Sequence, residues 1–176
     1  MKATGIVRRI DDLGRVVVPK EIRRTLHIRE GDPLEIFTDH DGEIILKKYS
    51  PIHDLTTFAQ QFCESASQIL NTTICVSDCD QFIAASGADK KIFLSQRIHP
   101  ELEDFIQDRG FTSTYNKGRF HPTLLASTES LHKKRAIATI ICHGDAIGCV
   151  AVIGYDDEEA LATAKIGAVF LGKQLE

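Results

Sequence analysis

The spacing of apolar residues changes at Tyr49-Ser50-Pro51, and this change divides the chain into two parts. Before it, short β-branched runs alternate with turns that contain Gly, Asp or Pro. After it, apolar residues recur at helical spacing and then in strand-like runs. We therefore expect two domains, residues 1–50 and residues 56–176, joined by a linker at residues 51–55.

Short strands and one short helix are expected in the first fifty residues. Thr4–Ile10 and Arg15–Val18 flank the turn sequence Asp-Asp-Leu-Gly, and Leu34–Thr38 and Glu43–Lys48 flank the turn at residues 39–42. A helix is expected after Pro19, because proline suits the first turn of a helix.

A unit this small cannot close a core alone. A domain of this size buries only about 60% of the surface that its unfolded chain exposes. A second copy that interleaves its hairpins would cover the unpaired strand edges. We therefore expect an obligate dimer through residues 1–50.

Charge is distributed unevenly along the chain, whose net charge is −4. Residues 1–29 carry eight bases and three acids (net +5), whereas residues 30–46 carry six acids and no base (net −6). Residues 51–176 carry eleven bases and sixteen acids (net −5). One face of the protein is therefore expected to be basic within an acidic molecule.

Six of the bases lie between Gly5 and Arg24, namely Arg8, Arg9, Arg15, Lys20, Arg23 and Arg24. Two interpretations of this cluster compete. The first is a solvated face that pairs with the acids of residues 30–46. The second is a nucleic-acid surface, favoured because five of the six are arginine, whose planar fork suits phosphates and guanine edges. On the expected helix, Ile22 and Leu26 share one face. The three bases of this helix fall on the opposite face: Lys20, Arg23 and Arg24.

The first fifty residues resemble the swapped-hairpin DNA-binding domain of the AbrB type, found in transition-state regulators of spore-forming bacteria. The segments GIVR, LGRVV, RRTL and IILKKY carry the resemblance. It implies two chains that interleave into one small mainly-β barrel, with DNA-binding arginines at Arg8, Arg15, Arg23 and Arg24. Arg9 stands where close relatives also carry a base and is included, whereas Lys20 stands where relatives are often apolar.

The second part is expected to be an α+β domain, an antiparallel sheet with flanking helices. Helices are expected from Leu55 to Leu70 (with Asp54 as N-cap), over Glu101–Arg109 and over Asp157–Leu175; strands are expected at Thr73–Ser77, Gln81–Ala85, Ala136–His143 and Ala146–Gly154. The terminal helix is apolar around more than half its circumference, which is typical of burial on two sides.

The segments VSDCDQFIAASG and GDAIGCVAVIG, together with the order of the elements, make this domain similar to a GAF sensor domain. The resemblance implies oligomerisation through the first and last helices and leaves open whether a small ligand binds. Two dimerisation surfaces in one chain would allow a homotetramer.

Catalysis, metal binding and cofactor binding are not expected. The pair Cys75 and Cys79 and the neighbours Cys142 and His143 fit buried thiols better than metal ligands, and the seven histidines are dispersed. The serines lack the strand–turn–helix frame of a nucleophile elbow. No stretch approaches the ~18 apolar residues of a membrane span, and we expect a cytoplasmic protein without a membrane partner.

The sequence therefore predicts a transcription factor that binds double-stranded DNA, and the resemblance implies that it activates and represses sporulation genes. Two alternatives stay open. One is an antitoxin-type regulator that neutralises a partner protein with the same N-terminal fold, and the other is a ligand-binding module without a role at DNA.

Overall fold

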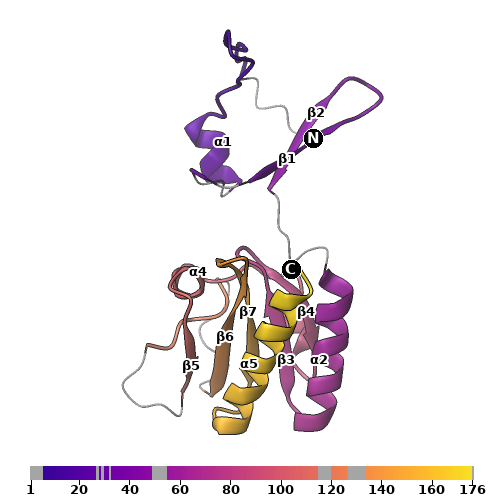
Figure 1. Cartoon of the computed structure of the whole chain (residues 1–176), viewed down its shortest axis with the longest axis vertical. Helices are drawn as coiled ribbons and strands as arrows, with labels where there is room; N and C mark the ends of the chain where they lie inside the picture. Colours follow the sequence, from indigo (N-terminus) through magenta and orange to yellow (C-terminus); the bar gives the residue numbers. More distant parts are fainter. Residues whose placement is uncertain are drawn as a thin grey trace. The chain divides into compact units, whose positions relative to one another are not determined.

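The computed structural model describes residues 6–26, 28, 30–31, 33–48, 55–114, 120–126 and 134–175. The chain divides into two compact units, Met1–Tyr49 and Ser50–Glu176 (Figure 1). Each unit is described by itself below.

In the N-terminal unit, the second expected hairpin forms. Strand β1 (Leu34–Thr38) pairs with β2 (Ile44–Lys48) in antiparallel register, with Ile36 opposite Leu46. Helix α1 (Lys20–Thr25) follows Pro19, which occupies its N-cap. These three elements agree with the prediction to within one residue, apart from the length of the helix, which ends before Leu26.

The first hairpin differs from the prediction. Its turn is present, but residues 6–10 and 15–18 pair with no strand among the residues that the structure describes, and Thr4 lies outside these residues. A strand requires a partner along its edge, and the swapped-hairpin arrangement takes that partner from a second chain. The prediction of four strands is therefore wrong for one chain by itself.

The C-terminal unit contains an antiparallel sheet, as the sequence predicts, with five strands in the order β4-β3-β7-β6-β5 rather than the four that were expected. Its elements in chain order are α2 (Thr56–Leu70), β3 (Thr73–Ser77), β4 (Phe82–Ser86), α3 (Lys90–Phe93), α4 (Pro100–Gln107), β5 (Phe111–Ser113), β6 (Arg135–Cys142), β7 (Asp145–Ile153) and α5 (Glu158–Lys173). The sequence did not predict α3 and β5, because segments of three or four residues show no period.

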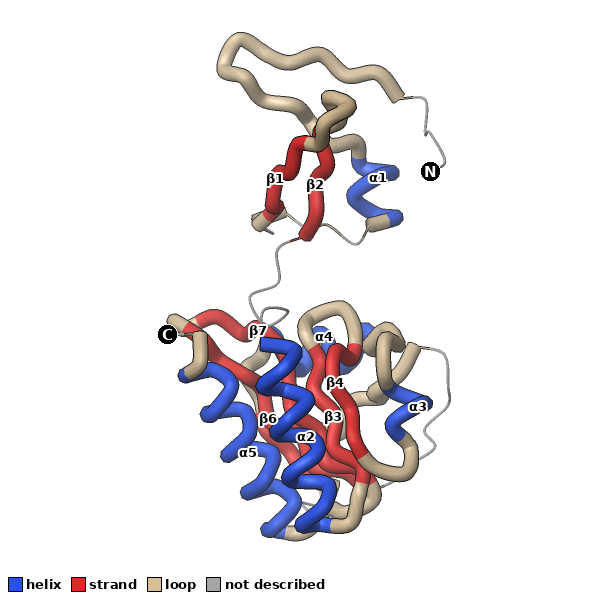
Figure 2. The backbone as a smooth tube through the Cα atoms, turned by 90° about the vertical axis from the view of Figure 1, so that its right-hand side faces the viewer, coloured by secondary structure: helices blue, strands red, loops and turns tan. Residues whose placement is uncertain are grey.

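Both faces of this sheet are covered (Figure 2). Alternation along each strand sorts the side chains: Ile74 and Val76 pack under α2 and α5, whereas Cys75 between them packs on the opposite face. The opposite face is filled by large side chains from β4, α3, α4 and the segment around residue 125. Strands buried on both faces explain the nearly continuous apolar runs of β6 and β7.

Helix α5 begins where the sequence predicts, because the carboxylate of Asp157 accepts a hydrogen bond from the Ala160 N–H at 2.8 Å. The N-cap of α2 is Leu55, one residue after the predicted Asp54, which lies outside the described residues. The thiols of Cys63, Cys75, Cys142 and Cys149 are buried, as predicted, and Cys79 is half-buried. Within the described chain, no helix has both the length and the apolar character needed to cross a membrane.

Candidate nucleic-acid interface

In the N-terminal unit, the carboxylate of Asp11 stabilises the turn at residues 11–15. The Asp11 N–H donates to the Arg15 carbonyl at 3.0 Å, and the Gly14 N–H donates to the Asp11 carbonyl at 3.0 Å. Gly14 has a φ of 76°, a conformation in which a glycine is favoured over residues with a Cβ. This is a three-residue hairpin loop closed by a glycine, so Asp11 and Arg15 face each other across its base.

The side chain of Asp11 uses both of its oxygens in this turn. Oδ1 accepts the backbone N–H groups of Leu13 (3.0 Å) and Arg15 (2.8 Å), and Oδ2 accepts the Nε–H of Arg15 at 2.8 Å. The pKa of Asp11 is lowered below its usual 3.8, first by the backbone N–H of Arg15 and then by its guanidinium. Asp11 is therefore ionised at neutral pH and fixed to the backbone.

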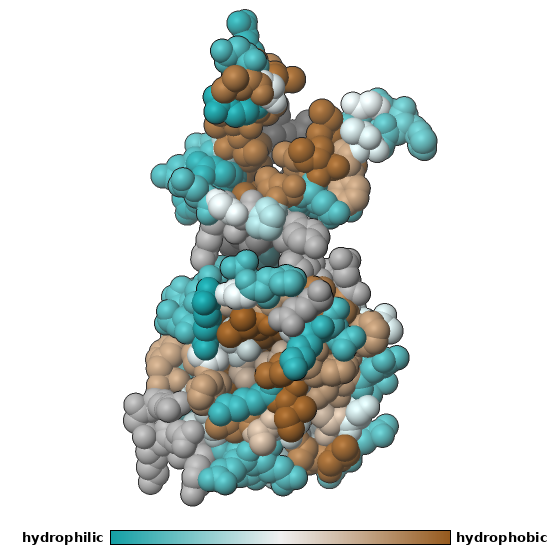
Figure 3. Space-filling model, viewed as in Figure 1, coloured by the Kyte–Doolittle hydropathy of each residue, from teal (hydrophilic) through white to brown (hydrophobic). Residues whose placement is uncertain are grey.

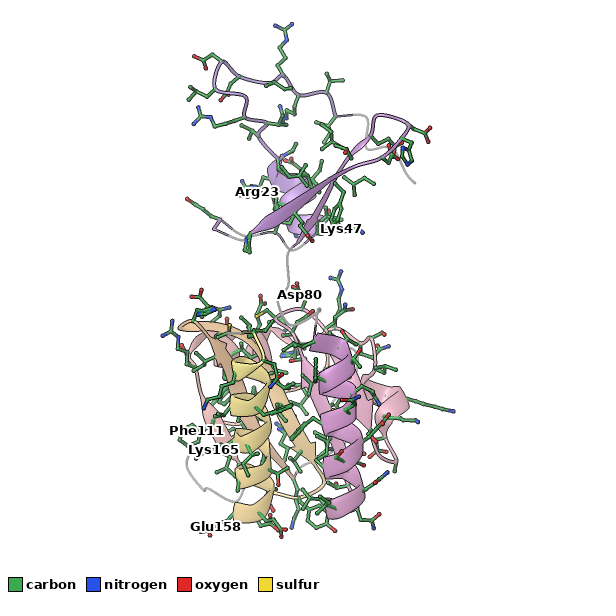
Figure 4. All side chains as sticks on the ribbon, turned by 45° about the vertical axis from the view of Figure 1, so that its right-hand side comes forward. Arg23, Lys47, Asp80, Phe111, Glu158 and Lys165 are labelled. Carbon is green, nitrogen blue, oxygen red and sulfur yellow. The ribbon has the colours of Figure 1, made fainter. Side chains whose placement is uncertain are left out.

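The remaining predicted arginines lie at two other places. Arg8 and Arg9 are exposed on the segment before the turn, and Arg24 is exposed on α1, as is Lys20. Arg23 is half-buried on α1, and its Nε is shielded from solvent without a hydrogen-bond partner among the described residues (Figure 4). The three bases of α1 therefore differ in exposure, with Lys20 and Arg24 exposed and Arg23 half-buried.

The structure brings Arg15 to Asp11. Among the described residues, no hydrogen bond or ion pair joins the arginines of the hairpin to those of α1. A DNA surface that uses the arginines of the hairpin and those of α1 together therefore depends on how these elements are arranged in space. In the swapped-hairpin fold, two chains provide that arrangement.

A second turn in the same unit has the same backbone hydrogen bonds as the first, but an acidic residue stands at the position of Arg15. Asp39 Oδ1 accepts the N–H groups of Asp41 (3.1 Å) and Glu43 (2.9 Å), and Gly42 has a φ of 80°. The residue at the position of Arg15 is Glu43. The turn geometry is therefore independent of the ion pair, and the basic character belongs to the first turn alone.

The C-terminal unit contains a partly buried polar network that was not predicted from the sequence. Arg135 begins β6, is 8% exposed and donates from Nη2 to the His121 carbonyl at 3.1 Å. Glu101 of α4 accepts the Thr123 N–H at 2.8 Å, and His121 Nδ1 lies 3.1 Å from Thr112 Oγ1. Burial lowers the pKa of Arg135, and nearby Glu101 opposes that effect. The sequence feature that could have indicated this network is Arg135, an arginine at the start of an apolar strand.

Two protein-family models match the chain. The model described as "Stage V sporulation protein T C-terminal, transcription factor" matches residues 54–176, and "Antidote-toxin recognition MazE, bacterial antitoxin" matches residues 7–53. Stage V sporulation protein T of Bacillus subtilis (strain 168) is 44% identical over 182 residues, covering 100% of this chain and 99% of that protein. The chain belongs to the stage V sporulation protein T family.

The N-terminal part of this SpoVT-family chain is also similar to the transition state regulatory protein AbrB of B. subtilis. The identity is 67% over 51 residues, covering 29% of this chain and 52% of AbrB. The resemblance to AbrB-type domains is thus confirmed.

A GAF domain from an Acinetobacter phosphoenolpyruvate-protein phosphotransferase is similar to the C-terminal unit. It is 12% identical, with a TM-score of 0.50, and the match covers 73% of this chain and 84% of that one. At this identity the likeness shows the fold alone. The predicted fold class, an AbrB-type N-terminal domain followed by a GAF-like antiparallel sheet with flanking helices, is confirmed for this SpoVT-family member.

Proposed function

We propose that this protein is a DNA-binding transcription factor that activates and represses sporulation genes. Two interleaved copies of residues 1–50 bind double-stranded DNA, a linker at 51–55 follows, and residues 56–176 oligomerise and transmit a signal. The protein acts by binding rather than by catalysis, and it acts in the cytoplasm. The observation that carries the proposal is the set of arginines presented at a hairpin turn and on a helix. The chain is similar to SpoVT along its whole length and to AbrB over 51 residues of its N-terminal part.

The DNA contacts are assigned to Arg8, Arg9, Arg15, Arg23 and Arg24. Arg8, Arg9 and Arg24 are exposed and have no acidic partner among the residues described, which argues against the interpretation as a solvated, self-neutralised face. The half-buried stem of Arg23 suits a side chain that is positioned before DNA binds.

Dimerisation of the N-terminal unit is supported by the apolar surface that one chain leaves uncovered. Ile36, Ile44 and Leu46 lie on the same face of β1–β2, and all three are exposed. Figure 3 shows apolar side chains at the surface of this unit. Small soluble domains rarely expose such a face, so a second copy is the expected cover.

Tetramer formation would use the outer faces of α2 and α5. These two helices lie side by side on one face of the sheet (Figure 2), and they expose Phe58, Ile69, Ile166, Val169 and Phe170. A pair of such faces from two chains would join N-terminal dimers into a homotetramer. Sensing of a small ligand would fall to the C-terminal unit, with no ligand class assigned.

DNA binding measured by fluorescence anisotropy across a salt series tests the function. If eight to ten phosphates are neutralised, log K falls against log[salt] with a slope of about −7 to −9. Arg23→Ala with Arg24→Ala should weaken binding and make the slope shallower. Lys90→Ala with Lys91→Ala is the matched control, because it removes two adjacent exposed bases from the C-terminal unit. Binding that is absent, or equal in both double variants, contradicts the proposal.

The antitoxin alternative is addressed by the folded C-terminal unit. A toxin-neutralising relative would be expected to continue into a disordered, partner-binding tail, whereas here two covered sheet faces follow the N-terminal domain. Limited proteolysis should leave a stable fragment near residues 51–176. Rapid degradation of that region would favour the antitoxin interpretation.

A further inference from the structure

The turn at residues 11–15 contains one contact that the turn itself does not need. Asp11 and Asp39 occupy equivalent places in two turns with the same backbone hydrogen bonds, and each uses Oδ1 to accept two backbone N–H groups. In the first turn, Oδ2 of Asp11 additionally accepts Nε–H of Arg15 at 2.8 Å. The second turn forms with Glu43 at the corresponding position, so the Asp11–Arg15 contact has a purpose other than closing the loop.

Stability is a weak candidate for that purpose. The side chain of Arg15 is 69% exposed and that of Asp11 is 35% exposed. Exposed ion pairs contribute little to folding, because water and salt screen them. For binding to phosphates, the contact is unfavourable, because a carboxylate beside the guanidinium opposes the attraction to DNA.

The contact between Asp11 and Arg15 fixes the orientation of the Arg15 guanidinium. The Asp11 carboxylate is fixed by two backbone N–H groups, and it holds Arg15 through Nε. In the described chain, no protein hydrogen bond occupies the two Nη groups, which form the bidentate edge of the guanidinium. A side chain held in this way loses less conformational freedom on binding and presents its edge in one direction.

We propose that Asp11 is a positioning residue that makes Arg15 a base-contacting arginine, one that binds the O6 and N7 acceptors of a guanine in the major groove. The inference rests on the proposed function and refines it. Arg8, Arg9 and Arg24 have no such carboxylate in the described residues, and they are assigned to phosphates. Asp11 thus contributes to sequence discrimination at some cost in general DNA affinity.

The test uses the full-length protein and the substitutions Asp11→Asn, Asp12→Asn and Asp39→Asn. Asn at position 11 keeps an oxygen for the backbone N–H groups but cannot accept Nε–H while the amide NH₂ takes the place of Oδ2. Asp12→Asn removes the same charge one residue away, and Asp39→Asn makes the same change in the equivalent turn. Each protein is bound to a pool of short duplexes with a random central sequence, which is sequenced before and after selection, and to an A·T-only duplex.

Asp11→Asn is expected to weaken binding to the wild-type-selected duplexes by about tenfold and to flatten the guanine preference. Its binding to the A·T-only duplex should be unchanged or tighter. The two control variants should keep the guanine preference. An Asp11→Asn profile equal to that of Asp12→Asn overturns the proposal, and so does wild-type selection without any guanine position.

Arg15→Lys provides an independent variant if Asp11→Asn does not fold. Lysine keeps the charge but lacks the fork and Nε, so it should lose the same discrimination, and the double variant should lose no more than either single one. A lysine variant that keeps the guanine preference overturns the proposal. A wild-type protein without salt-dependent DNA binding would instead contradict the proposed function itself.

Discussion

Isoleucines of the two units have opposite environments: Ile36 and Ile44 are 68% and 70% exposed, whereas Ile74 and Ile140 are completely buried. All of them sit in strands with a similar alternation of side chains. The C-terminal unit surrounds its strands with α2 and α5 on one face and with α3, α4 and a long segment on the other. Among its described residues, the N-terminal unit has one short helix and one pair of strands, which are too few to cover a sheet face.

This difference shows that one chain contains two kinds of folding unit. The C-terminal unit has its own core and should keep its structure at any protein concentration. The N-terminal unit exposes apolar side chains that its own elements do not cover, so its structure should depend on a second chain. Substitutions in each unit can test this division.

The substitution Ile36→Asp should disrupt the N-terminal dimer. If a second chain covers this face, the variant buries an unpaired carboxylate, which costs several kcal/mol and raises the dimer dissociation constant by more than about a thousandfold. Analytical ultracentrifugation of a protein comprising residues 1–50 measures this directly. Glu35→Gln, on the opposite face of β1, is the control and should leave the dimer intact. A dimer that tolerates Ile36→Asp would mean that another surface joins the chains.

In the C-terminal unit, Leu102→Ala should lower the free energy of unfolding by about 2–5 kcal/mol, because the side chain is completely buried and leaves a cavity. Urea unfolding of the full-length protein, followed by circular dichroism, measures the change in the transition of this unit. The matched control is Leu94→Ala, whose leucine is 45% exposed and should cost less than about 1 kcal/mol. Equal losses for the two leucines would contradict the core described for this sheet face.

The substitution Gly172→Ala should destabilise the C-terminal unit by about 1–3 kcal/mol. Alanine normally stabilises a helix relative to glycine, but a Cβ at this position would lie 2.3 Å from the carbonyl oxygen of Ile141 in β6. Thermal unfolding measures the sign of the effect. At Gly167 the obstacle is the ring of Phe62, a side chain that can rotate, so Gly167→Ala should cost less. A stabilising Gly172→Ala would mean that α5 lies farther from the sheet.

The smallest predicted effect concerns the pKa of Asp11. This pKa lies below 3.8, so the contacts of the ionised carboxylate are present above pH 3.8 and are lost as the pH falls through the lowered value. Arg15→Ala should raise the pKa of Asp11 only part of the way toward 3.8, since the backbone N–H groups of residues 13 and 15 remain. Titration of the carboxyl carbon by NMR measures both values, with Arg24→Ala as a control that should not move them. An unchanged pKa in Arg15→Ala would indicate that the guanidinium is not held at Oδ2.

Much of the fold was predictable because it depends on local pattern. In the C-terminal unit, all the elements except the short α3 and β5 follow from period and capping, and the β1–β2 hairpin follows from the Asp-His-Asp-Gly turn. The candidate arginines were visible because five of them gather in twenty residues of an otherwise acidic chain. Their resemblance to AbrB-type domains extended this reasoning from charge to a DNA-binding fold.

Other features were decided by residues far apart in the sequence. Arg135 meets Glu101 and His121 only because β6, α4 and the segment before residue 126 converge, and no spacing rule links them. The environment of Arg23 also escaped the sequence, because helical arithmetic assigns a side chain to a face but not to the neighbours that shield it. The contact of Asp11 Oδ2 with Arg15 lay between the two cases: the turn was predictable from Asp and Gly, but the direction of the guanidinium required atomic positions.

The division into two domains, the type of each domain and the position of the basic cluster could be predicted from the sequence alone, since these depend on periodicity, composition and local turns. Two features required the folded structure: residues 6–10 and 15–18 have no strand partner among the described residues of one chain, and one of the clustered arginines is held by a carboxylate. The physical reason is that hydrogen-bond pairing and side-chain direction depend on groups brought together by folding, and in the N-terminal unit some of those groups are expected to belong to a second chain.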